Sequence, residues 1–155
     1  MKGDARILDR LNDLLSDELT ATNQYMVHSE MCDNWKYERL HKAVEGRAIT
    51  EMKHAEKLIA RVLFLEGKPI VSNLKKINIG DNVEEQFKND LQAEHDAVKA
   101  YNDAIRVATD VGDNGTRDML DDILEDEEEH VDWLEAQLDQ IEQMGLQNYL
   151  AEQVE

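Results

Sequence analysis

Residues 125–133, EDEEEHVDW, contain five consecutive acidic residues followed at once by a histidine. Runs of acidic residues usually lie on a solvated helix face. Here the run crosses an apolar seam with the three- and four-residue spacing of a helix, in which Glu127 stands between Leu124 and Val131. We therefore expect Glu127 to point inward. The acids expected to face solvent are Glu125, Glu128, Glu129 and Asp132, and the pattern leaves Asp126 open.

The same spacing predicts an all-α chain, because long periodic segments alternate with short groups of helix-breaking residues. Thr116 ahead of Asp118 is one of the expected helix starts. The predicted helices cover residues 4–33, 36–66, 82–111 and 116–144, with a short helix at 146–153, in a single domain spanning 1–155.

The segment 67–81 decides the topology. Gly67 and Pro69 end the second helix, and the residues that follow have no helical periodicity. Fully extended, about 15 residues span about 50 Å, whereas a helix of about 30 residues is about 45 Å long. The loop can therefore run the length of the bundle and make the second and third helices parallel. We expect a ferritin-like four-helix bundle with one long crossover and a short C-terminal fifth helix.

Each long helix carries one glutamate near the middle of its apolar seam. Two of them begin a Glu-x-x-His motif, which puts both side chains on one helix face. The pairs Glu18/Glu94, Glu51/Glu127, His54/His130 and Tyr25/Tyr101 are all 76 residues apart. The chain therefore reads as two helical hairpins related by a pseudo-twofold axis, with polar groups at matched depth.

A third Glu-x-x-His sequence, Glu38 to His41, has no counterpart 76 residues on. It is flanked by Lys36, Arg39 and Lys42 and begins its helix. We expect it to lie on the surface.

Four converging carboxylates would repel one another unless cations neutralise them. Arg47 and Lys53 are close in sequence but do not fall on the seam, so we expect no help from them. Two divalent cations would balance the four charges and leave both histidines neutral. Carboxylate and imidazole ligands suit iron or manganese better than a structural zinc ion. The set is the one that di-iron carboxylate bundles use.

Composition restricts the remaining classes of function. With 35 acidic residues against 17 Lys and Arg, the formal net charge of −18 argues against a nucleic-acid partner. One cysteine excludes a disulfide framework and favours a reducing, cytoplasmic location. The N-terminus has no signal-peptide pattern, and no apolar stretch approaches a membrane span.

Several longer motifs carry a family resemblance over essentially the whole chain. They are MKGD (1–4), NQY (23–25), EMKHA (51–55), LFLEG (63–67), NIG (78–80), DEEEHVDWLE (126–135) and MGLQNYL (144–150). With these motifs the chain resembles the bacterioferritins. The resemblance implies a ferroxidase di-iron centre in which Glu51 and Glu127 bridge the metals. Glu18 with His54, and Glu94 with His130, would complete one iron each, and Tyr25 would lie beside the centre.

The resemblance also implies a second cofactor and a large assembly. Met52 would ligate a haem b shared between two subunits, and dimers would build a 24-subunit shell. Fe(II) would be oxidised by O₂ or H₂O₂ and stored as mineral inside, which is iron storage and detoxification. A small ferredoxin would supply electrons for iron release.

Some positions depart from the family pattern. Gly46 and Thr50 stand where some bacterioferritins have a His and an Asp that bind an additional iron on the inner surface. Arg47 is an unusual cation near the acidic centre, and Trp35 and Trp133 are expected to be packing residues.

Two alternatives remain open. One is a di-iron carboxylate oxidase or peroxidase that forms no storage cage. The other is a purely structural cage subunit or a DNA-protecting mini-ferritin. The complete ligand set within one chain argues against the latter, because mini-ferritins build their sites between subunits.

Overall fold

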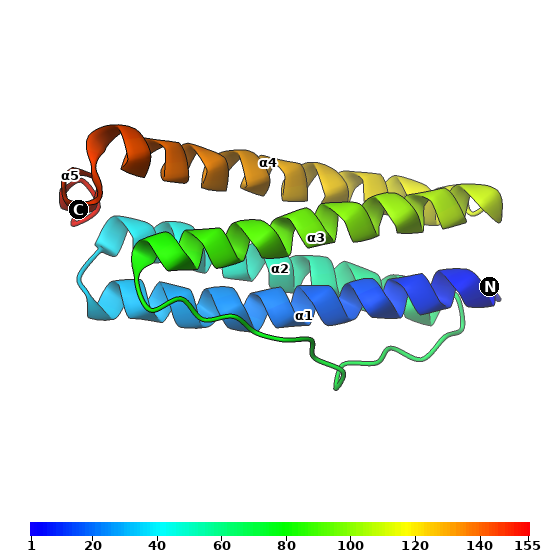
Figure 1. Ribbon diagram of the computed structural model, residues 1–155. Coiled ribbons are helices and arrows are strands. Elements are labelled where there is room, and N and C mark those ends of the chain that lie inside the picture. The colour runs from blue at the N-terminus through cyan, green and yellow to red at the C-terminus, as the bar shows by residue number, and fades with distance from the viewer.

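The computed structural model describes residues 1–155 and is entirely helical (Figure 1). Its elements are α1 (Ala5–Asn34), α2 (Glu38–Phe64), α3 (Val83–Asp110), α4 (Asn114–Met144) and the short α5 (Leu146–Ala151). The predicted fold class, a four-helix bundle with a fifth C-terminal helix, is confirmed. None of the helices combines the length and the apolar character needed to cross a membrane.

Side-chain caps explain where three of the helices begin. The carboxylate of Asp4 accepts a hydrogen bond from the Arg6 amide at the start of α1, and Asn82 does the same for Glu85 at the start of α3. The expected start of α4 at Thr116 is wrong. Asp113 is the cap, because its side chain accepts from the Thr116 amide, and so α4 begins at Asn114.

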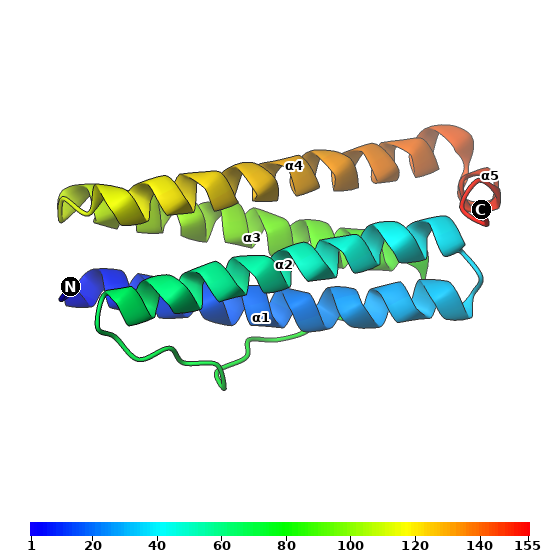
Figure 2. The same cartoon turned by 180° about the vertical axis from the view of Figure 1, so that it is seen from behind.

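The helices form two antiparallel hairpins joined by the crossover. Short turns connect α1 to α2 and α3 to α4, whereas residues 65–82 run back along the bundle beside α1. This return makes α2 and α3 parallel, as Figures 1 and 2 show from opposite sides. The short helix α5 lies across the end of the bundle where α4 finishes.

A polar stripe on α1 holds the crossover in place. The stripe consists of residues spaced four apart, Asn12, Ser16, Thr20, Gln24 and His28. Asn12 accepts from the Ile70 amide at 2.9 Å, Thr20 from Lys75 at 2.9 Å and Gln24 from Asn78 at 3.1 Å. His28 Nε2 accepts from the Gly80 amide at 3.0 Å, and Ser16 donates to the Asn73 carbonyl. The crossover thus satisfies its backbone groups on one helix face without helical structure of its own.

The apolar core is divided into two main clusters along the bundle axis. One contains Leu15, Ala55, Tyr101 and Ile123 and reaches toward the N-terminal end of α1. The other lies toward α5, where the buried ring of Tyr149 contacts Phe87 edge-on. The seam glutamates come between these clusters along each helix, so the polar centre has apolar packing on both sides.

Two glycine substitutions test how closely the crossover is fitted. A Cβ on Gly80 would lie 2.4 Å from the Gln86 backbone nitrogen, whereas one on Gly46 in α2 would meet nothing within 4 Å. We expect Gly80→Ala to lower the thermal unfolding midpoint, because backbone must move. Gly46→Ala should raise it, since alanine favours a helix over glycine by about 0.5–1 kcal/mol. Equal midpoints for the two variants would contradict the close fit of the crossover at Gly80.

Candidate metal centre

The predicted acidic centre is buried in the middle of the bundle. The four seam glutamates are each at most 1% exposed, and both histidines are buried. They come from all four long helices, which places Glu18 on α1, Glu51 and His54 on α2, Glu94 on α3, and Glu127 and His130 on α4. The structure therefore brings all six predicted residues together.

The ligand atoms form two overlapping groups. In one group Glu18, Glu51, His54 and Glu127 offer atoms that all lie within 4.8 Å of one another. In the other, Glu51, Glu94 and His130 do the same. Glu51 belongs to both groups, so it lies where a carboxylate could bridge two ions.

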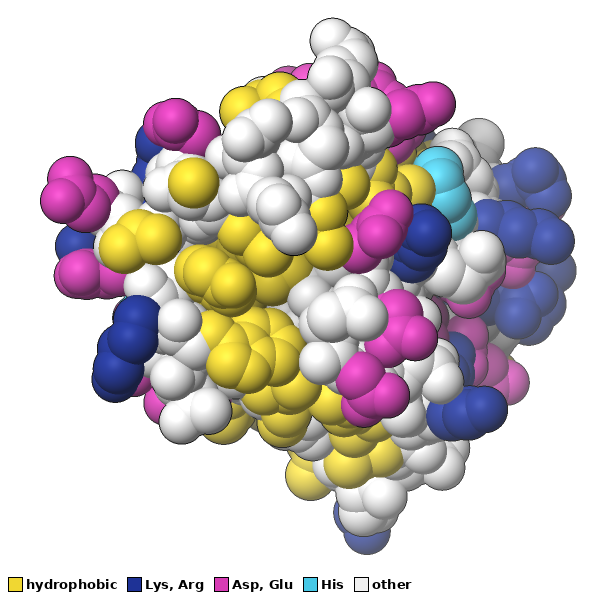
Figure 3. Space-filling model, turned by 60° about the vertical axis from the view of Figure 1, so that its left-hand side comes forward, with side chains coloured by type: hydrophobic (Ala, Val, Ile, Leu, Met, Phe, Trp, Pro, Cys, Tyr) yellow, Lys and Arg dark blue, Asp and Glu magenta, His cyan; other side chains and the backbone are white.

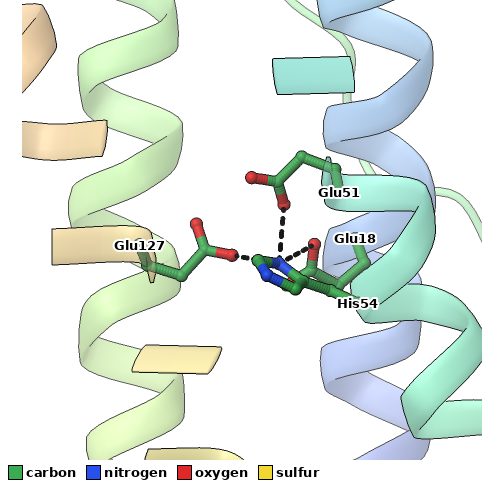
Figure 4. A group of neighbouring side chains, drawn as sticks. All are labelled: Glu18, Glu51, His54 and Glu127. Carbon is green, nitrogen blue, oxygen red and sulfur yellow. Dashed lines mark hydrogen bonds and ion pairs between the residues drawn. The ribbon is translucent and has the colours of Figure 1, made fainter. Parts of the chain in front are cut away.

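His54 lies in the middle of the first group (Figure 4). Its Nδ1 is 3.0 Å from Glu127 Oε1, 3.5 Å from Glu18 Oε2 and 3.8 Å from Glu51 Oε2. The other ring nitrogen, Nε2, is 2.8 Å from the half-exposed carboxylate of Asp126. Asp126, which the acidic run left open, thus fixes the orientation of the His54 ring.

His130 is held mainly by rings. Its Nδ1 lies 2.9 Å from Glu94 Oε1. Trp133 stacks on the imidazole at a centroid distance of 6.0 Å, and Tyr25 meets it edge-on at 5.4 Å. Trp133 therefore packs, as expected, but it packs against a residue of the centre.

Two tyrosines cross-link the halves of the bundle. Tyr25 donates a hydrogen bond to Glu94, and Tyr101 donates to Glu18 Oε1 at 2.5 Å. Burial, reinforced by Glu94, raises the pKa of Tyr25 well above its usual value; burial and Glu18 do the same for the pKa of Tyr101. Both hydroxyls therefore stay protonated donors. The 76-residue offset already pointed to Tyr101, but no role was predicted for it.

Arg47 contradicts the expectation that no cation of the chain reaches the centre. Its side chain is only 13% exposed, and Nη2 lies 2.7 Å from Glu51 Oε1 and 3.1 Å from Glu127 Oε2. Burial opposes its charge, but Glu51, Glu94 and Glu127 outweigh burial and raise the pKa of the guanidinium. The backbone of Arg47 lies off the seam, yet its long side chain reaches around the helix. The four-residue spacing to Glu51 was the signal that could have found it.

The carboxyl groups respond differently to burial. Burial, with Glu51 as the next cause, raises the pKa of Glu18, and burial with Glu18 raises that of Glu127. Burial acts in the same direction on Glu51, but its contacts with Glu18, His54 and Arg47 outweigh it and lower the pKa of Glu51. Without metal, protons and Arg47 thus compensate the crowded charges.

Two buried carboxylate oxygens have no hydrogen-bond partner, Glu18 Oε2 and Glu94 Oε2. One belongs to each ligand group. A buried, unpartnered carboxylate oxygen is costly, and a metal ion would satisfy it. This donor set therefore fits a pair of cations.

A cavity of about 180 Å³ adjoins the centre. Four of its lining residues are the seam glutamates. Others come from the crossover, Lys75, Lys76 and Asn78, so the cavity extends from the crossover to the acidic centre.

The remaining predicted positions lie outside the centre. Met52 is on α2 and 42% exposed, with its neighbour Ile49 also exposed. Glu38 is exposed and pairs with Lys42, and the His41 ring instead contacts the Ser29 carbonyl. The solvent positions expected for Glu125, Glu128, Glu129 and Asp132 are confirmed.

Comparisons with known proteins agree with this fold and site. A family model described as "Ferritin-like domain" matches residues 8–144. The chain is 40% identical to "Bacterioferritin" of Brucella melitensis over 149 residues, covering 96% of this chain and 92% of the relative. It is 38% identical to "Bacterioferritin BfrA" of Mycobacterium tuberculosis (98% and 96% covered). It is 41% identical to "Bacterial ferritin" of Synechocystis sp. (99% of each chain).

The matched domain defines the chain as ferritin-like. The full-length relatives narrow this class, and the chain belongs to the bacterioferritin family. Membership of this family implies iron storage.

The charge on His54 gives a pH test of the metal-free centre. Burial opposes the charged ring, but hydrogen bonds with Glu127 and Glu51 outweigh burial and raise the pKa of His54 to about 10 from the usual 6.5. Between these values the folded chain keeps a proton that the unfolded chain has lost, so rising pH favours unfolding.

We expect the unfolding midpoint of the metal-free protein to fall between about pH 7 and about pH 9. The variant His54→Gln should show a shallower dependence, because it lacks the titrating ring. The same slope in both proteins, measured by calorimetry in the presence of a chelator, would rule out this assignment of the proton.

Proposed function

We propose that the buried centre is a ferroxidase site that binds two iron ions and oxidises Fe(II) for storage. The observation that carries the proposal is Glu51, which contributes to two groups of buried ligands at once. The six proposed metal ligands are Glu18, Glu51, His54, Glu94, Glu127 and His130. Four carboxylates balance two divalent ions, and carboxylate with imidazole suits iron.

Iron supplies the redox chemistry, with O₂ or H₂O₂ as oxidant. The chain supplies a fixed, water-poor site. Asp126 orients His54 through its outer nitrogen, and Trp133 and Tyr25 orient His130. Tyr25 and Tyr101 hold Glu94 and Glu18 through hydrogen bonds, which keeps these carboxylates pointed inward.

The cavity beside the centre supports a direct route for Fe(II). Asp17 and Asp96 line it together with the crossover residues, and it ends at the four glutamates. A lining of carboxylates attracts divalent cations.

The finer assembly belongs to the same proposal. We infer a shell of 24 copies built from dimers, which stores the oxidised iron as mineral. The exposed apolar side chains of Ile49, Met52 and Leu63 on α2, and of Val71 on the crossover, support burial against another subunit. The C-terminal part of α1 adds exposed Met26 and Val27, and Figure 3, which views that end of the molecule, shows hydrophobic surface there.

Met52 is the proposed axial ligand of a haem b shared across a dimer. Its exposed position among apolar neighbours fits a site completed by a second subunit. When bound, the haem would carry electrons for iron release, and a small ferredoxin is the proposed donor. A di-iron oxidase or peroxidase that forms no cage is the alternative, and a monomer or dimer mass in solution would favour it.

The variant Glu94→Ala tests the ferroxidase proposal. It removes a ligand of the second group, so we expect rapid Fe(II) oxidation to fall at least about 100-fold while the assembly keeps its mass. Stopped-flow absorbance after anaerobic Fe(II) loading measures the rate. Glu128→Ala, which removes an exposed acid from α4, is the matched control and should keep the rate. Fast oxidation in Glu94→Ala would reject the site.

The variant Met52→Leu tests the haem proposal. Leucine has a similar volume but no sulfur ligand, so the Soret band of purified protein reconstituted with haem should disappear. Met144→Leu replaces another exposed methionine, on α4, and should keep the band. An unchanged spectrum in Met52→Leu would exclude this ligand, whatever the outcome for Glu94→Ala.

A further inference from the structure

The two metal positions are built from matched residues, but their surroundings are not matched. Glutamates, histidines and tyrosines of the centre all recur at an offset of 76 residues. The counterpart of Arg47 is Ile123, a buried core residue, and the counterpart of Asp126 is Thr50. Two charged groups next to the centre therefore occur on one side of the pseudo-twofold axis alone.

Arg47 occupies oxygens that a second ion would need. It pairs with Oε1 of Glu51 and Oε2 of Glu127, whereas the other oxygen of each carboxylate faces His54. Glu127 accordingly belongs to the His54 group and not to the group of Glu94 and His130. One ion can thus bind near His54 with Arg47 in place. A second ion, bridged to the first, must take over oxygens that the guanidinium holds.

The supporting carboxylate favours the same position. Asp126 lies 2.8 Å from the outer nitrogen of His54 and strengthens this imidazole as a ligand. Thr50, at the matching place beside His130, donates its hydroxyl to the Gly46 carbonyl instead. His130 therefore has no equivalent support.

Charge leads to the same order. One divalent ion and Arg47 supply three positive charges against the four carboxylates. Two divalent ions with Arg47 still in place supply five, which exceeds the carboxylate charge by one. The space next to Gly46 is open, with nothing within 4 Å of where a Cβ would stand, so Arg47 has room to move outward.

We propose that Arg47 is a resident cation that the second metal ion must displace, so that the His54 position fills first and tightly and the His130 position second and weakly. The inference rests on the proposed two-ion centre. It gives the second position the character of an exchangeable site. Arg47 acts on the metals through the carboxylates and is thus a positioning residue.

The test uses Co²⁺, which is redox-inert here and absorbs visible light when bound. Full-length, metal-free protein is titrated without oxygen by calorimetry and absorption. We expect two Co²⁺ per chain, bound in two steps. In Arg47→Gln the second step should tighten about tenfold or more, the order of one charge-assisted pair, while the first changes little.

A second readout moves in the opposite direction. Without metal, Arg47→Gln leaves carboxylates unpaired, so its unfolding midpoint should fall, and saturating Co²⁺ should raise that midpoint more than in the wild type. Lys57→Gln removes an exposed charge from the same helix and should change neither result. Arg47→Lys keeps the charge without the two-pronged contact and should lie between wild type and Arg47→Gln; it also serves if Arg47→Gln does not fold.

The outcomes separate this inference from the proposed function. An unchanged second step in Arg47→Gln, or in Arg47→Lys where that variant stands in, would overturn the role of Arg47. So would two equal steps in the wild type. Failure of the wild type to bind two Co²⁺, or a cobalt spectrum unaffected by Glu94→Ala, would instead overturn the two-ion centre itself.

Discussion

Four carboxylates in the interior of one helical bundle are the constraint on which the rest of the structure depends. A single buried carboxylate is costly, and four within one small space add mutual repulsion. The chain reduces this cost with two tyrosine donors, two histidines and one arginine, and the apolar clusters on either side keep water away. Cations complete the balance, so the site that is hardest to fold without metal is also the one prepared to bind it.

Much of this design could be predicted from the spacing of residues. The helical periodicity located Glu127 within the acidic run, and the 76-residue offset paired it with Glu51. Such patterns work because a helix fixes the direction of each Cβ. The length of the segment 67–81 predicted the crossover for an equally simple reason, since a chain segment must span the distance it connects.

The remaining features depend on side chains that periodicity does not fix. Arg47 lies off the seam, but several rotatable bonds let it reach Glu51 and Glu127. Asp126 lies next to an inward residue and turns its carboxylate to His54 on another helix. The start of α4 was misplaced because both Asp113 and Thr116 are good caps, and only their hydrogen bond shows which of them accepts.

The fastening of the crossover has a consequence for how the centre opens. Between α2 and α3 the chain is held to α1 by a few hydrogen bonds, and most of its side chains are exposed. Within one chain this is the segment with the least apolar contact, so it belongs to the regions whose local unfolding costs least. Because the same residues wall the cavity beside the glutamates, fraying of the crossover would unroof the centre while the four helices stay folded. Insertions or deletions there would alter the permeability of the centre without altering its ligands.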